Sequence, residues 1–122
     1  MKLIDKIIHV NETEAVVSTK IQENWPLVDK NCANPIIMIE LIAQTAGILE
    51  GFLNLEKEGI GGSGWLVGIK EANFHINRVP INKILIISAT KSNIFDNFGI
   101  IKGEVKLEEK IIGEATLQAI QP

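Results

Sequence analysis

The chain has 122 residues, 46% of them hydrophobic and 22% charged, which is typical of one globular domain with a real core. We expect a single domain over residues 1–122, and no apolar run is long enough to span a bilayer. The net charge of −3 and the single arginine, Arg78, argue against a nucleic acid partner, because phosphate binding needs clustered positive charge.

We expect no secretory signal at the N-terminus, because Met1 to Asp5 lack an apolar core and a small-residue cleavage site. Cys32 is the only cysteine and can form no internal disulfide. We therefore expect a cytoplasmic protein. Because no histidine or cation stands beside Cys32 in the sequence to lower the pKa of its thiol, we interpret it as an ordinary thiol.

The first elements are two predicted strands, Leu3 to Val10 and Ala15 to Ile21, which are rich in β-branched residues. The polar segment 11–14 between them predicts a turn, so the two strands should form a hairpin. The following segment, Gln22 to Asn34, contains Pro26 and loses the strand pattern, which indicates a loop or short irregular turns.

A long helix should follow this loop. Asn34 is a good N-cap, Pro35 suits the first helical turn, and Gly59 is a typical C-terminal signal, which gives a helix of about 22 residues. One narrow stripe of this helix carries Glu40, Gln44, Gly47 and Gly51, whereas most of its circumference is apolar. We expect a sheet to enclose it.

The remainder of the chain predicts long antiparallel strands. Their expected ranges are Trp65 to Phe74, Lys83 to Asn93, Gly99 to Leu107 and Ile111 to Ile120. The glycine-rich segment Gly59 to Gly64 runs from helix to strand, the reverse of a phosphate-binding loop, so we interpret it as a connector. The fold class is α+β, with a curved antiparallel sheet around one long helix.

Glu40 is the strongest candidate for chemistry, because it is a lone carboxylate in the apolar segment 35–47. Burying an ionised carboxylate is costly unless the group is paired, hydrogen-bonded or protonated. The alternative is a structural carboxylate at a partly wet subunit interface, satisfied by the backbone or by Gln44 one turn later.

Glu40, Ala43 and Gln44 form the pattern E-x-x-A-Q on the central helix, and the segment from Gly68 to Pro80 looks like a strand that runs through a phenylalanine to a proline turn. With the order of elements, this resembles the hot-dog fold 3-hydroxyacyl-(acyl carrier protein) dehydratases of fatty acid synthesis over nearly the whole chain. The resemblance implies a hot-dog fold, a dimer, and an acyl thioester in a tunnel along the helix.

In that family a histidine from the loop before the helix removes the C2 proton, while the helix carboxylic acid of the other subunit assists departure of the C3 hydroxyl. Here Asn24 or Trp25 occupies the place of the histidine, and neither is basic at neutral pH. The family's glycine, whose N–H polarises the thioester carbonyl, falls at or next to Pro35, which has no N–H; Ile36 could supply a substitute.

Three functions therefore remain open: a dehydratase subunit that needs a histidine-bearing partner in a mixed dimer, an acyl thioesterase with Glu40 as general base, and a non-catalytic acyl-binding protein. The expected ligand is an acyl-carrier-protein or coenzyme A thioester, the expected assembly is a homodimer or mixed dimer, and no cofactor or metal ion is expected. Glu40 is the catalytic candidate. The binding candidates are Gln44, Ile36, Gly47, Trp25 and His75, the last through its place near the family's tunnel-forming strand.

Overall fold

The structure is a computed structural model of the chain and describes residues 3–58, 66–95 and 98–120. The predicted connector Gly59 to Gly64 lies outside these residues. In chain order the elements are β1 (Lys6–Val10), β2 (Glu14–Lys20), β3 (Val28–Asp29), β4 (Cys32–Ala33), α1 (Ile37–Glu58), β5 (Leu66–Phe74), β6 (Val79–Pro80), β7 (Ile84–Phe95), β8 (Phe98–Leu107) and β9 (Lys110–Ile120).

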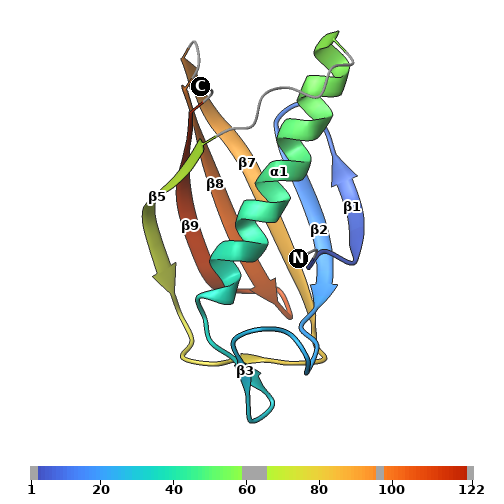
Figure 1. Cartoon of the computed structure of the whole chain (residues 1–122), viewed down its shortest axis with the longest axis vertical. Coiled ribbons are helices and arrows are strands. Elements are labelled where there is room, and N and C mark those ends of the chain that lie inside the picture. Colours follow the sequence, from blue (N-terminus) through green and yellow to red (C-terminus); the bar gives the residue numbers. More distant parts are fainter. Residues whose placement is uncertain (1–2, 59–65, 96–97, 121–122) are drawn as a thin grey trace.

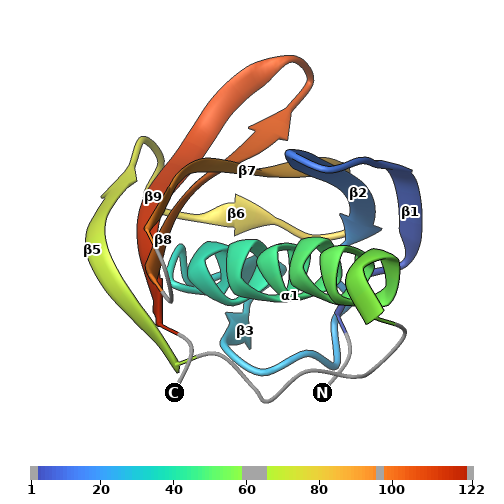
Figure 2. The same cartoon turned by 90° about the horizontal axis from the view of Figure 1, so that it is seen from above.

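A curved antiparallel sheet of six strands covers one side of the helix (Figures 1 and 2). Its strand order is β1-β2-β7-β8-β9-β5. Seen from above, α1 lies in the hollow of the sheet, with β1 and β5 at the two edges (Figure 2). The predicted fold class is therefore confirmed.

The predicted elements agree closely with the observed ones. β1 and β2 form the expected hairpin, in which Ile7 pairs with Val17. α1 has 22 residues, the expected length. The region 22–34 holds two short strands that the sequence pattern does not predict, since β3 and β4 have two residues each and join β6 in a small second sheet. Elements this short carry no periodic signal in a sequence.

Two glycines of the sheet allow α1 to approach it closely. A Cβ atom at Gly103 of β8 would overlap the side chain of Ile42, and one at Gly113 of β9 would lie 2.7 Å from Sδ of Met38. Met38 and Ile42 are fully buried on the helix face that looks onto the sheet. The absence of two side chains thus sets the helix–sheet distance.

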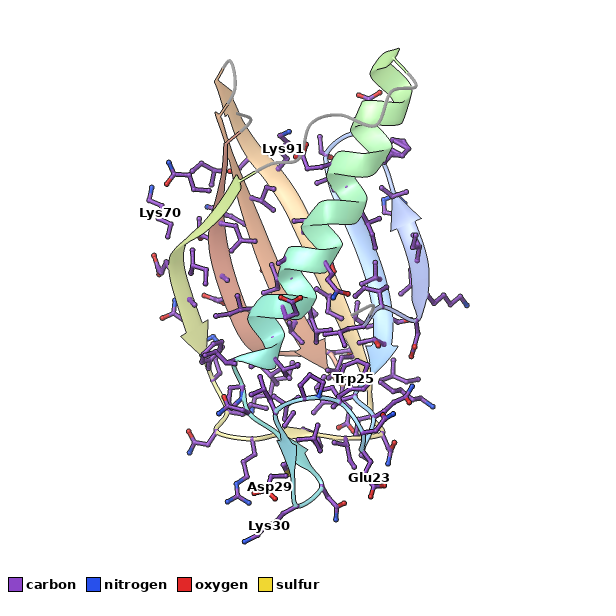
Figure 3. All side chains as sticks on the ribbon, viewed as in Figure 1. Glu23, Trp25, Asp29, Lys30, Lys70 and Lys91 are labelled. Carbon is purple, nitrogen blue, oxygen red and sulfur yellow. The ribbon has the colours of Figure 1, made fainter. Side chains whose placement is uncertain are left out.

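One ion pair lies inside this contact. Nζ of Lys91 on β7 is 2.8 Å from Oε1 of Glu50 on α1, and the two side chains are only 6% and 9% exposed. Lys91 extends from β7 toward the helix (Figure 3). The sequence contained a signal for it, because Lys91 continues the inward-facing series Leu85, Ile87 and Ala89.

Replacement of Gly103 by alanine should destabilise the fold by about 1–3 kcal/mol, because the new methyl group overlaps the branched side chain of Ile42 in a filled core. Urea unfolding followed by circular dichroism measures the change. Gly68→Ala is the matched control, since a Cβ atom there meets no atom within 4 Å. Equal stability of the two variants would contradict the account of the helix–sheet contact.

Candidate functional site

Glu40 lies in the first turn of α1, on the stripe of the helix that the sheet does not cover. The opposite face, with Met38, Ile42 and Leu49, is buried against the sheet, whereas Glu40 and Gly47 are exposed. The expected enclosure of the helix is therefore right for its sheet-facing side and wrong for the Glu40 stripe within one chain. The carboxylate faces solvent unless a second molecule covers it.

Glu40 forms the polar part of an otherwise apolar pocket of about 430 Å³. Its other lining residues are aliphatic or proline and come from the N-terminal segment, the loop before the helix, the helix start and β5: Leu3, Pro26, Leu27, Ile36, Ile37, Ile39 and Ile69. Ile36, Leu27 and Ile69 are each about half exposed, which is unusual for large aliphatic side chains. The arrangement suits an apolar ligand that presents a polar group to a carboxylate.

Gln44 connects Glu40 to the N-terminal segment. Its Oε1 accepts a hydrogen bond from the backbone N–H of Leu3 at 2.8 Å, and its Nε2 donates to Oε1 of Glu40 at 3.4 Å. The hydroxyl of Thr19 in turn donates to the carbonyl oxygen of Leu3 at 2.5 Å. The bond from Leu3 fixes which end of the Gln44 amide faces Glu40, so Gln44 positions the carboxylate.

The helix start offers no spare N–H group for a substrate carbonyl. Pro35 has none, and the N–H of Ile36 donates to Oδ1 of Asn34 at 3.0 Å. The N–H groups of Ile37, Met38 and Ile39 donate to backbone carbonyls of residues 34–36 at 2.9–3.1 Å. Asn34 is thus the predicted N-cap, and its side chain already occupies the donor that we expected Ile36 to offer a thioester.

The two residues at the expected position of the histidine point elsewhere. Trp25 packs against the hydrophobic core, near the N-terminal end of α1 in Figure 3. Asn24 lines a separate polar groove of about 690 Å³ together with Asp5 and Lys20. Neither residue lines the Glu40 pocket.

The two histidines also lie away from Glu40. Nε2 of His75, just after β5, is 3.5 Å from the Glu114 carboxylate on β9. His9 on β1 contacts Asn11 and Glu14. The structure therefore brings together Glu40, Gln44 and Ile36 of the predicted site, keeps Gly47 on the same stripe, and separates Trp25 and His75 from the pocket.

Sequence reasoning did not identify Leu3, Leu27 and Ile69 as pocket residues. Each belongs to a different segment, and only the folded chain brings them together. Ile69 carried a weak signal, since it stands on a predicted strand next to the small residue Gly68. Leu3 and Leu27 carried none.

Replacing Gln44 by methionine should lower the free energy of unfolding by about 1–2 kcal/mol, because the backbone N–H of Leu3 loses its acceptor. Chemical denaturation measures the effect. Gln22→Met, at an exposed loop position, should change stability by less than about 0.5 kcal/mol. An unchanged stability of the Gln44 variant would mean that this hydrogen bond does not hold the N-terminal segment.

Comparison with known proteins places this geometry in context. A family model described as ApeP-like, ApeP dehydratase, matches residues 1–122. The 3-hydroxyacyl-[acyl-carrier-protein] dehydratase FabZ of Lactobacillus helveticus is 31% identical over 131 aligned residues, which cover 98% of this chain and 82% of that protein.

Solved structures share the fold. The dehydratase heterocomplex ApeI:P from Xenorhabdus doucetiae superposes with a TM-score of 0.83 at 16% identity, covering 99% of this chain and 83% of that one. A hypothetical thioesterase with coenzyme A from Streptococcus pneumoniae superposes with a TM-score of 0.75 at 16% identity, covering 96% and 84%. At these identities the structural likeness establishes only the fold. The chemistry has to be argued from the residues of the site.

Proposed function

This chain belongs to the ApeP-like dehydratase family, and we propose that it supplies the carboxylate half of a dehydratase site for 3-hydroxyacyl thioesters, completed by a histidine from a related partner chain. It is a dehydratase-like hot-dog protein, as the resemblance in its sequence implied. The single domain over residues 1–122 and the cytoplasmic location are parts of the same proposal.

One observation carries the proposal. Glu40 stands in an apolar pocket, held by Gln44, and no residue that lines this pocket in the described part of the chain is a histidine. The carboxylate and its support are present, and the base is not. The site therefore contains one of the two groups that dehydration requires.

The reaction divides between these two groups. A base takes the proton from C2 of the 3-hydroxyacyl thioester, the electron pair of that C–H bond forms the C2–C3 double bond, and the C3 hydroxyl leaves as water with a proton from a carboxylic acid. We assign the acid to Glu40 and the base to the partner's histidine. The proton on the histidine afterwards returns to solvent and the acid is reprotonated, so the site is restored.

The proposed partner also explains the exposure of Glu40. Burial favours the protonated form of a carboxyl group, which is the form that the reaction needs. A second chain that covers the Glu40 stripe would provide this burial.

The edge strand β5 is the proposed place of attachment. Among the strands that the structure describes, it pairs with β9 alone, and it leaves Ile69 56% and Phe74 40% exposed. An unpaired edge presents backbone N–H and C=O groups that another strand can bond. The similar ApeI:P protein from Xenorhabdus doucetiae is a dehydratase heterocomplex, which supports a mixed dimer.

The acyl group is proposed to arrive on an acyl carrier protein or on coenzyme A. The FabZ relative is named for an acyl-carrier-protein substrate, which supports the first carrier. No helix in the described ranges is long and apolar enough to cross a membrane.

The mixed complex with a histidine-bearing relative from the same genome should dehydrate 3-hydroxyacyl thioesters, and Glu40→Gln in this chain should lower kcat at least about 100-fold, because the amide cannot donate the proton that the leaving hydroxyl needs. Spectrophotometry of the enoyl thioester follows the reaction, and native mass spectrometry the complex. Glu12→Gln, in an exposed turn, is the matched control. Full activity of the Glu40→Gln complex would refute the assignment.

A thioesterase is the second candidate, favoured by the exposure of Glu40, which leaves the carboxylate open to an attacking water. If this chain alone hydrolyses acyl-CoA with Glu40 as base, Glu40→Ala should lower thiol release at least about 100-fold in an assay with a thiol reagent. Hydrolysis that is unaffected by the substitution removes this candidate.

A further inference from the structure

Leu27 has a backbone conformation that its side chain disfavours. Its φ is 67°, in the left-handed region where branched aliphatic residues are rare. Lys30 and Asn31 also have positive φ, but they form the two-residue turn between β3 and β4, where the backbone geometry of a tight hairpin requires it. Leu27 lies in a turn with Pro26 directly before β3, and a positive φ at a turn position after proline is usually taken by glycine or asparagine rather than by leucine.

Contacts on its C-terminal side hold Leu27 in this conformation. Its carbonyl oxygen accepts a hydrogen bond from the N–H of Asn34 at 2.9 Å, and Asn34 caps the helix that carries Glu40. Val28, the next residue, pairs with Ala33 across the small sheet. Rotation of the Leu27 backbone to an ordinary conformation would break the link between the loop and the helix cap.

The Leu27 side chain is exposed to solvent when no ligand is bound, which is unfavourable for an apolar group. Leu27 is 51% exposed and forms part of the wall of the Glu40 pocket. A glycine at this position would relieve the backbone and remove exposed apolar surface. A leucine instead gives a ligand in the pocket an apolar contact. A bound ligand would therefore offset both the backbone strain and the exposure of apolar surface.

We propose that Leu27 is a specificity-determining residue that contacts the acyl chain of a thioester held beside Glu40, an inference that rests on the proposed function of this pocket. The chemical class that it selects is an acyl chain that is apolar beyond its C3 carbon. Apart from Glu40, the pocket offers such a chain only aliphatic and proline neighbours, including Leu3 and Ile69.

The test measures binding, so that it does not depend on turnover. Non-hydrolysable thioether analogues of acetyl-, hexanoyl- and decanoyl-CoA are titrated calorimetrically into the chain alone and into its complex with the histidine-bearing relative. Leu27→Ala should lower affinity for the hexanoyl and decanoyl analogues about tenfold and for the acetyl analogue less than about twofold, because two carbons are too few to fill a pocket of about 430 Å³. Leu27→Met should retain most of the affinity for the long analogues.

Two controls separate recognition from structure. Leu27→Gly should lose the same affinity while raising the thermal unfolding midpoint by about 2–4 °C, since it removes the strain together with the contact. Ile84→Ala removes an equally exposed aliphatic side chain outside the pocket and should leave the series unchanged.

An unchanged chain-length profile in folded Leu27→Ala and Leu27→Gly overturns the inference and leaves the proposed function standing. A lower unfolding midpoint in Leu27→Gly contradicts the strain from which the inference starts. Absence of thioester binding to both wild-type preparations removes the proposed function and this inference together.

Discussion

The close approach of α1 to the sheet determines the rest of this structure. At Gly103 and Gly113 the helix meets backbone where other residues would place a side chain, so Ile42 and Met38 fill the hollow of the sheet directly. A helix that packs this closely against the sheet buries one face in the core, and its opposite stripe must face outward. The start of α1 is in turn tied through Asn34 to the loop before it. The position of the Glu40 carboxylate therefore follows from packing and capping at places where no chemistry occurs.

The pocket holds the Glu40 carboxylate, which Gln44 supports. None of its described lining residues is the histidine that the family would place beside this carboxylate. Leu3, Gln44 and Glu40 form a chain of hydrogen bonds that links the N-terminal segment to the carboxylate. At the same time the N–H groups of the first helical turn are already bonded within the chain, so a thioester carbonyl must find its donor elsewhere. Both features fit the proposed site shared between two chains. A chain in such an assembly is under no physical requirement to carry every catalytic group itself.

Much of the fold could be predicted from the sequence, because it depends on local patterns. Asn34 and Pro35 mark the helix start, and the strand pattern from Gly99 to Leu107 marks β8, as the structure confirms. The candidate site was harder to predict from the sequence. The E-x-x-A-Q pattern identified Glu40 and Gln44, which lie one helical turn apart, but the pocket wall combines segments far apart in the chain, and Leu27 owes its place to a backbone conformation that no periodic pattern encodes.

The buried pair of Glu50 and Lys91 has a consequence for the direction in which the helix faces. Aliphatic side chains tolerate some exchange of partners, so the ion pair adds a second constraint on the rotation of α1 to the contacts at Gly103 and Gly113. A roll by one position, about 100°, would separate these two charges and break their ion pair in a dry contact, at a cost of several kcal/mol. The pair thus favours one rotation of α1 about its own axis, the one in which Glu40 faces away from the sheet.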